Sequence, residues 1–201
     1  MVWVSRSRWI NHKVSYDLQL ITGVEDKVDL VSPRLHLSND LKGKYAMQIS
    51  RIANDPEIAR RIGGHGFPFP YTEEDGRIFL DMNRKYGKTH FAMDFLIFSE
   101  NLLVGVIGLK DIDYTDFKAH VGYWIGREYW NKGYASEALS LVVDYAKGEL
   151  GLRRLYTKVL DFNLPSLRVL MKNGFMIEGF ERDSYKLEDG FHSMFCLGRI
   201  L

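Results

Sequence analysis

The first third of the chain carries helical patterns separated by turn-forming residues. Apolar residues recur three and four positions apart over residues 42–53, which predicts a helix. Asp55 and Pro56 then mark the start of a second helix, because Asp is a favoured cap and Pro fits the first helical position. Thr72 and Asp75 resemble a capping box at the start of a third helix. The inner face of that third helix is predicted to consist of Ile78, Phe79 and Met82.

Strand-like patterns dominate the rest of the chain, with two helices between them. The runs that fit strands are 34–37, 91–98, 102–109, 119–125, 155–160, 175–187 and 191–197. Helical spacing returns over residues 135–146 and 165–172, and Gly174 ends the second of these helices. This mixture of strand-like and helical segments, in which no internal repeat occurs, predicts one α/β (α+β) domain over residues 31–201. Residues 1–30 have no firm period and are interpreted as an N-terminal extension.

Composition and charge narrow the class of protein. The chain has 201 residues, of which 46% are hydrophobic and 26% charged, as in ordinary globular domains. A formal net charge of +1 supplies no broad field for a nucleic-acid backbone, and no apolar stretch is long enough to span a bilayer. The single cysteine, Cys196, excludes an internal disulfide and fits a reducing compartment. We therefore expect a cytoplasmic monomer or homodimer that binds neither nucleic acid nor membrane.

The most informative segment is residues 122–138, where a predicted strand passes through a short loop into a helix. Small residues at Gly133 and Ala135 let a ligand approach the backbone closely, and the first N–H groups of a helix have no partners within it. Together these features favour phosphate binding. The alternative is that Gly133 serves only to turn the strand into the helix.

Two motifs carry a resemblance to a known family. Gly122-Tyr123-Trp124, followed by residues 130–138, resembles the pyrophosphate-binding motif of the GNAT N-acetyltransferases, especially the branch of ribosomal-protein and aminoglycoside acetyltransferases. Further along, Asn163, Ser166 and the later Gly174-Phe175 are similar to the second signature of the same family. Because both motifs occur in the family's order, the resemblance covers roughly residues 31–199.

The resemblance implies a GNAT fold and a coenzyme site. The fold would be a mixed, largely antiparallel central sheet flanked by helices and splayed at the strand ending near Ile125, where acetyl-CoA would bind without a metal. The residues assigned to the coenzyme are Trp124, Ile125, Arg127, Asn131, Lys132, Gly133, Tyr134, Ala135, Asn163, Ser166 and Lys172. At Trp124 and Ile125 the backbone would be used. Asn163 could instead be only a helix cap, and Lys132 and Lys172 ordinary solvated charges.

The expected chemistry needs a base, because an amine attacks a thioester only when it is neutral. His120 is the best candidate, since strand alternation places it on the same face as Trp124 and its unperturbed pKa near 6.5 lets it accept a proton at neutral pH. It could alternatively be a packing residue. Many family members protonate the leaving thiolate with a Tyr where this chain has Leu170, which leaves Ser166, or water, as the donor.

The amine site is expected where an aromatic loop meets the final hairpin. Residues 63–71 carry Phe67, Phe69 and Tyr71, and we expect them to bind the amine together with residues 184–192. The predicted activity is transfer of an acetyl group to a primary amine, with a peptide or protein N-terminus favoured because no acidic run marks a site for a polycation. The alternatives are a small amine (polyamine, amino acid or aminoglycoside) and a non-catalytic acyl-CoA-binding module.

Overall fold

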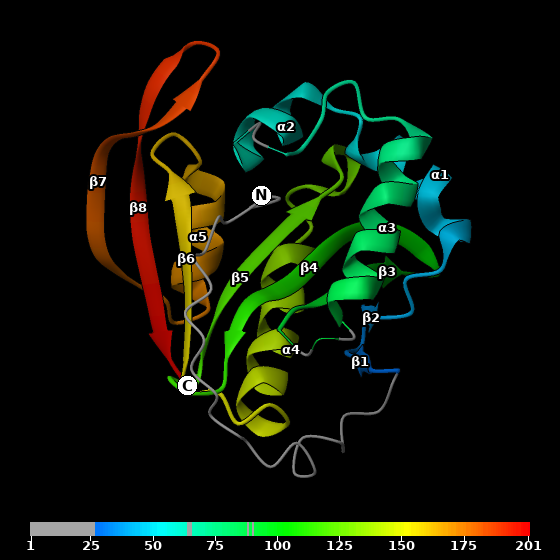
Figure 1. The fold of residues 1–201 in the computed structure, drawn as a ribbon, viewed down its shortest axis with the longest axis horizontal. Coiled ribbons are helices and arrows are strands. Elements are labelled where there is room, and N and C mark those ends of the chain that lie inside the picture. The colour runs from blue at the N-terminus through cyan, green and yellow to red at the C-terminus, as the bar shows by residue number, and fades with distance from the viewer. Residues whose placement is uncertain (1–26, 64–65, 88, 90) are drawn as a thin grey trace.

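The computed structural model describes residues 27–63, 66–87, 89 and 91–201, so most of the predicted N-terminal extension lies outside the described residues. The described chain forms an eight-stranded sheet in the order β1-β2-β3-β4-β5-β6-β8-β7. Helices lie on both faces of this sheet (Figure 1). The predicted α/β fold class, with a mixed and largely antiparallel sheet, is confirmed.

Most of the predicted elements form close to the expected positions. The strands are β1 (Asp29–Val31), β2 (His36–Ser38), β3 (Met93–Ser99), β4 (Leu102–Asp113), β5 (Lys118–Ile125), β6 (Arg154–Leu160), β7 (Met176–Leu187) and β8 (Gly190–Ile200). The helices are η2 (Gly43–Tyr45), α1 (Ala46–Ala53), α2 (Pro56–Ile62), α3 (Glu73–Gly87), η3 (Arg127–Tyr129), α4 (Tyr134–Gly148) and α5 (Leu164–Lys172).

The sheet separates two apolar layers. On one face, α4 and α5 pack on alternate residues of the central strands, such as Phe95, Ile107 and Val121, all of which are fully buried. On the other face, α1, α2 and α3 cover the opposite set of residues on β3 and β4, including Leu96 and Val106. Burial of apolar side chains on both faces is the main stabilising term for such a sheet.

Local signals at helix starts behave as the sequence predicts. The Asp55 carboxylate accepts hydrogen bonds from the backbone N–H groups of Glu57 (2.8 Å) and Ile58 (3.3 Å) at the start of α2. The Thr72 hydroxyl accepts from the Asp75 N–H at 3.2 Å, and Asp75 accepts from the Thr72 N–H at 2.8 Å. Both caps satisfy N–H groups that a helix leaves without partners.

The predicted inner face of α3 is wrong at Ile78, which is 48% exposed. The buried residues of this helix are instead Gly76, Leu80 and Asn83. The cause is a close approach between helices: a Cβ atom on Gly76 would lie 2.6 Å from the Ala46 carbonyl oxygen of α1. This contact is possible only for glycine and turns the Gly76 side of α3 towards α1 and the sheet.

The parallel pair β5–β6 separates after three residues. Lys118, Ala119 and His120 of β5 pair with Arg154, Leu155 and Tyr156 of β6. Beyond this point β5 continues to pair with β4 as far as Ile125, and β6 continues to pair with β8 as far as Leu160. The two strands diverge from each other in Figure 1. The expected splay of the central sheet is therefore confirmed.

Candidate functional site

The gap between β5 and β6 defines the site. On the β5 side it is bordered by residues 121–125, and on the β6 side by residues 157–160, which lead into α5. No ladder joins these two stretches among the described strands. Backbone amides along such an edge can pair with the amides of an extended ligand, as a neighbouring strand would.

The turn before α4 exposes backbone donors next to this gap. Gly133 has a φ of 83°, and Asn131 has a φ of 62°, so the turn uses the left-handed region twice. The first hydrogen bond of α4 runs from the Glu137 N–H to the Gly133 carbonyl at 3.1 Å, and no side chain caps the helix. Within the described part of the chain, the N–H groups at positions 134–136 therefore have no protein partner and can bind an anion.

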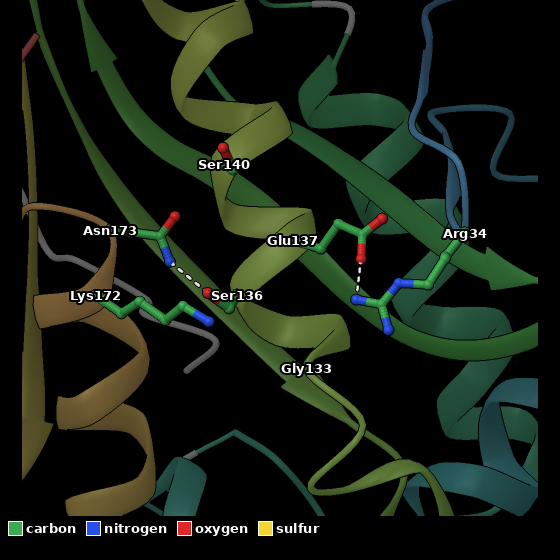
Figure 2. A pocket seen from close by; sticks show the side chains of 7 residues that line it. All are labelled: Arg34, Gly133, Ser136, Glu137, Ser140, Lys172 and Asn173. Atoms are coloured by element: carbon green, nitrogen blue, oxygen red, sulfur yellow. Dashed lines mark hydrogen bonds and ion pairs between the residues drawn. The ribbon is translucent and has the colours of Figure 1, made fainter.

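A pocket of about 400 Å³ lies over the first turns of α4. It is lined by Arg34, Gly133, Ser136, Glu137, Ser140, Lys172 and Asn173. Figure 2 shows the Arg34 and Lys172 side chains on opposite sides of Gly133. The pocket thus combines Lys172 and the Arg34–Glu137 ion pair with a helix N-terminus, and the N-terminus and Lys172 suit phosphate groups.

Arg34 and Glu137 were not predicted from the sequence to line this pocket. Glu137 holds the Arg34 side chain there. The Glu137 carboxylate forms an ion pair with Arg34 and accepts a hydrogen bond of 2.6 Å from the Ser32 hydroxyl. Arg34 also donates to the Lys132 carbonyl at 3.1 Å. The connection between β1 and β2 is therefore attached to the turn before α4.

Other predicted coenzyme residues surround the same turn and gap but make protein contacts. The Arg127 guanidinium lies 3.4 Å from the Asp55 carboxylate. The Lys132 ammonium lies 5.2 Å from the centre of the Tyr129 ring, and the Tyr134 hydroxyl accepts a 3.1 Å hydrogen bond from Ser99. The Ile125 carbonyl accepts from the Trp130 indole at 2.7 Å. Ala135 is half-buried in the first turn of α4.

Asn163 connects the start of α5 to α2. Its side-chain oxygen caps α5 by accepting from the Ser166 N–H at 3.4 Å. Its amide nitrogen donates to the Arg61 carbonyl of α2 at 3.3 Å. The helix-cap role is therefore present, and a role beside a coenzyme stays a prediction.

His120 lies on β5 at the last pair before the gap, on the face that carries Trp124. Its ring is half-buried, packs edge-on against Tyr156 (5.6 Å between centroids), and its Nε2 lies 3.4 Å from the Thr157 hydroxyl. Burial lowers the pKa of His120 to about 4, and the positive charge of Lys110 acts in the same direction. The imidazole is therefore neutral at pH 7, but it is a weaker base than the unperturbed histidine expected from the sequence.

A buried polar cluster beside His120 was not predicted. Lys110 pairs with His120 across β4 and β5, and its ammonium forms an ion pair with Asp94 of β3. The same ammonium donates to the Asn83 side-chain oxygen of α3 at 2.6 Å. Asp94 is only 5% exposed, and its pairing holds the Lys110 ammonium in place near His120.

Ser166 lies in the first turn of α5, across the gap from β5. Its hydroxyl is 3.0 Å from the hydroxyl of Tyr123, which is the residue before Trp124. Leu170, where many GNAT enzymes have a Tyr, is 1% exposed within the apolar layer. A tyrosine hydroxyl therefore lies at the site, but it comes from β5 instead of from α5.

The aromatic loop divides into buried and exposed residues. Phe67 and Tyr71 are 9% and 6% exposed and pack on each other, and Phe67 also packs edge-on against Trp124 at 5.9 Å. Phe69 is 52% exposed. The final hairpin reaches this region, because the Tyr185 hydroxyl donates to the Gly63 carbonyl at 2.6 Å. The loop and the hairpin are thus adjacent, and their role in binding the amine stays a prediction.

The described residues contain neither a candidate metal site nor a candidate membrane-spanning helix. Across residues 27–63, 66–87, 89 and 91–201, no group of three or more His, Cys, Asp or Glu side chains is placed to hold a metal ion. In that same part of the chain, no helix combines the length and the apolar character needed to cross a membrane.

Comparison with known proteins gives consistent matches. The family model for the acetyltransferase (GNAT) domain matches residues 37–176. The ribosomal-protein-serine acetyltransferase of Escherichia coli (strain K12) is 30% identical over 133 residues, which cover 66% of this chain and 74% of that protein. An uncharacterized N-acetyltransferase of Bacillus licheniformis is 39% identical over 84 residues, or 42% of this chain and 47% of the relative. The match to the Bacillus licheniformis protein thus spans about half of that protein's length.

Solved structures show the same fold. The ribosomal α-N-protein acetyltransferase RimL in complex with coenzyme A superposes with a TM-score of 0.77 at 20% identity, covering 87% of this chain and 98% of that one.

Proposed function

The chain belongs to the GNAT acetyltransferase family, and on that premise we propose that it transfers the acetyl group of acetyl-CoA to the α-amine of a peptide or protein N-terminus. The observation that carries this proposal is the gap between β5 and β6 beside the open turn at Gly133. One side of the gap offers an unpaired strand edge, and the turn offers free N–H groups. An extended pantetheine arm with a diphosphate at its end has the matching groups.

The coenzyme would be held mainly by the backbone. The β5 edge at Trp124 and Ile125 would pair with the pantetheine amides, and the N–H groups at positions 134–136 would bind the diphosphate. Lys172 would add positive charge from one side of the pocket, and Arg34, which is paired with Glu137, would contribute N–H donors from the other side (Figure 2). A bound CoA therefore fits the residues present without a metal.

The acetyl transfer itself needs little from side chains. The amine nitrogen attacks the thioester carbon, a backbone N–H of the β5 edge stabilises the negative oxygen, and the C–S bond then breaks to release the thiolate. His120, on the opposite face from Ser166, would accept the proton that the attacking nitrogen loses. Ser166 would donate a hydrogen bond to the departing sulfur.

The lowered basicity of His120 favours an α-amine over a lysine side chain. An α-amino group with a pKa near 8 is about one-quarter neutral at pH 7.5, whereas a lysine with a pKa near 10.4 is neutral in about one molecule per thousand. A histidine whose pKa is about 4 holds a proton only briefly at neutral pH. Such a base suits an acceptor that is already substantially neutral in water. The E. coli relative named a ribosomal-protein-serine acetyltransferase supports a protein as the acceptor.

A comparison of acceptors tests the proposal. Acetyl-CoA turnover would be measured with peptides that carry a free N-terminus, with the same peptides blocked at the N-terminus but containing lysine, and with spermidine, free amino acids and an aminoglycoside. Turnover only with the free N-terminal peptides supports the proposal. Faster turnover with a small amine would replace it by the small-molecule alternative, and no turnover despite bound CoA would indicate a non-catalytic module.

A further inference from the structure

Tyr123 and Ser166 connect the two borders of the gap between β5 and β6. Tyr123 lies on β5 after the last pair with β6, and Ser166 lies in the first turn of α5. The Tyr123 hydroxyl oxygen lies 3.0 Å from the Ser166 hydroxyl oxygen and 3.3 Å from the Ser166 carbonyl oxygen. Tyr123 lies between Gly122 and Trp124 on the strand edge that is proposed to bind the pantetheine arm.

The direction of the hydrogen bond between the two hydroxyls follows from the distances. The Tyr123 hydroxyl has one proton, and the Ser166 hydroxyl oxygen, at 3.0 Å, is a nearer acceptor than the Ser166 carbonyl oxygen, at 3.3 Å, so we assign the proton to the Ser166 hydroxyl oxygen. Burial raises the pKa of Tyr123 above its ordinary value, and the hydroxyl therefore remains a donor at any working pH. When Tyr123 donates to the Ser166 oxygen, the proton of Ser166 is free to point elsewhere.

We propose that Tyr123 is a positioning residue that directs the Ser166 hydroxyl proton at the coenzyme sulfur, where it stabilises the thiolate formed when the C–S bond breaks. This inference rests on the proposed function. Tyr123 keeps its own proton, and the thiolate takes a proton from water as CoA leaves. The donor is then the Ser166 hydroxyl of α5, oriented by Tyr123 of β5, and Leu170 occupies the α5 position where the family resemblance implies a tyrosine.

The acidity of the bound CoA thiol tests the inference without any acceptor amine. The thiol pKa would be followed by the carbon-13 chemical shift of the carbon bonded to sulfur, in labelled CoA bound to the full chain. A donated hydrogen bond favours the thiolate, so the bound thiol should be about tenfold more acidic than free CoA. Tyr123→Phe and Ser166→Ala should each remove most of this effect, and the double variant should change it no further, because both residues act on one hydrogen bond.

Tyr145→Phe is the matched control. Tyr145 of α4 is also buried, but in the described structure its hydroxyl has no hydrogen-bond partner, so its removal should leave the thiol pKa unchanged. With an acceptor peptide, Tyr123→Phe should lower kcat about tenfold and leave the KM for acetyl-CoA unchanged.

The outcomes separate this inference from the proposed function. If CoA binds and Tyr123→Phe leaves its thiol as acidic as in the unmodified protein, the positioning role is overturned while the acetyltransferase proposal stands. Additive effects of the two variants would also overturn it, since Tyr123 would then not act through Ser166. A chain that does not bind CoA in calorimetry overturns the proposed function and this inference with it.

Discussion

A single glycine controls access to the backbone donors at the start of α4. Gly133 adopts the left-handed conformation, and a Cβ atom there would meet only the Arg34 guanidinium, at 3.5 Å. There is thus room for a side chain, and the main consequences of replacing Gly133 are backbone strain and whatever charge the new side chain carries. A matched pair of variants can separate these two effects.

Gly133→Asp is expected to weaken CoA binding more than Gly133→Asn. Both side chains have similar size and tolerate the left-handed region better than other residues, but only Asp places a negative charge beside the phosphates. Repulsion of about 1–2 kcal/mol corresponds to roughly tenfold weaker binding of CoA to the Asp variant. Isothermal calorimetry measures both affinities. Equal affinities of the two variants would show that the diphosphate does not bind at this turn.

His120 is the residue whose predicted behaviour the structure changes most. His120→Ala should lower kcat about 10²-fold, near the low end for general-base assistance, because a base with a pKa of about 4 accepts protons weakly. CoA affinity should not change. His120→Glu should retain part of the activity if a carboxylate can take the same role.

The pH profile gives an independent check on His120. Between about pH 6 and pH 9, kcat/KM should rise with the ionisation of the acceptor amine, because the imidazole is already neutral there. Two peptides with different α-amine pKa values should therefore give inflections that differ in the same way. A single inflection near pH 6.5, lost in His120→Ala, would show instead that burial does not lower the histidine pKa.

Among the structural elements, the aromatic loop between α2 and α3 carries both a buried and an exposed phenylalanine. Phe67 is buried between Tyr71 and Trp124 and so supports the strand edge at the gap. Phe69 is largely exposed and makes no comparable core contact. The two phenylalanines therefore allow stability and acceptor binding to be tested separately within one short segment.

Phe69→Ala should raise the KM for the acceptor amine while leaving the KM for acetyl-CoA and the free energy of unfolding nearly unchanged. Phe67→Ala should instead destabilise the fold by about 3–4 kcal/mol, since it leaves a cavity in the apolar layer. Urea unfolding and steady-state kinetics on both variants measure these quantities. Equal changes of the two KM values in Phe69→Ala would assign the loop a structural role only.

For the whole molecule, the burial of His120 couples folding to pH. The pKa of this histidine is about 4 in the folded protein and near 6.5 in the unfolded chain, so the unfolded chain binds more protons between these values. The contribution of His120 to stability therefore rises with pH across this window and falls on acidification. The Lys110–Asp94 ion pair adds to the effect by keeping a cation beside the ring.

Acidification from about pH 6.5 to pH 4 should cost the unmodified protein up to about 3 kcal/mol more stability than it costs His120→Gln. The variant lacks the group that must be kept neutral but retains a polar side chain of similar size. Urea unfolding of both proteins at several pH values gives the difference directly. Parallel stability curves would mean that His120 is solvated and titrates normally in the folded state.

The amino-acid sequence by itself determined the features that depend on near neighbours along the chain. The cap at Asp55, the Thr72–Asp75 capping box and the glycine turn into α4 involve residues within a few positions, and all three form as predicted. The two family motifs are also local. They indicated the family and the sheet with its splay, and they predict where the coenzyme binds.

Only the tertiary structure decided which distant residues share the site. Arg34 and Glu137 are 103 positions apart, and Tyr123 and Ser166 are 43 apart, so neither pair has a local signal. The approach of Gly76 to Ala46 likewise set the orientation of α3 and left Ile78 exposed. The pKa of His120 depends on burial and on Lys110 across the strand pair. The physical reason is the same in each case: these properties arise from strand register and packing between elements, which residue type and spacing do not specify.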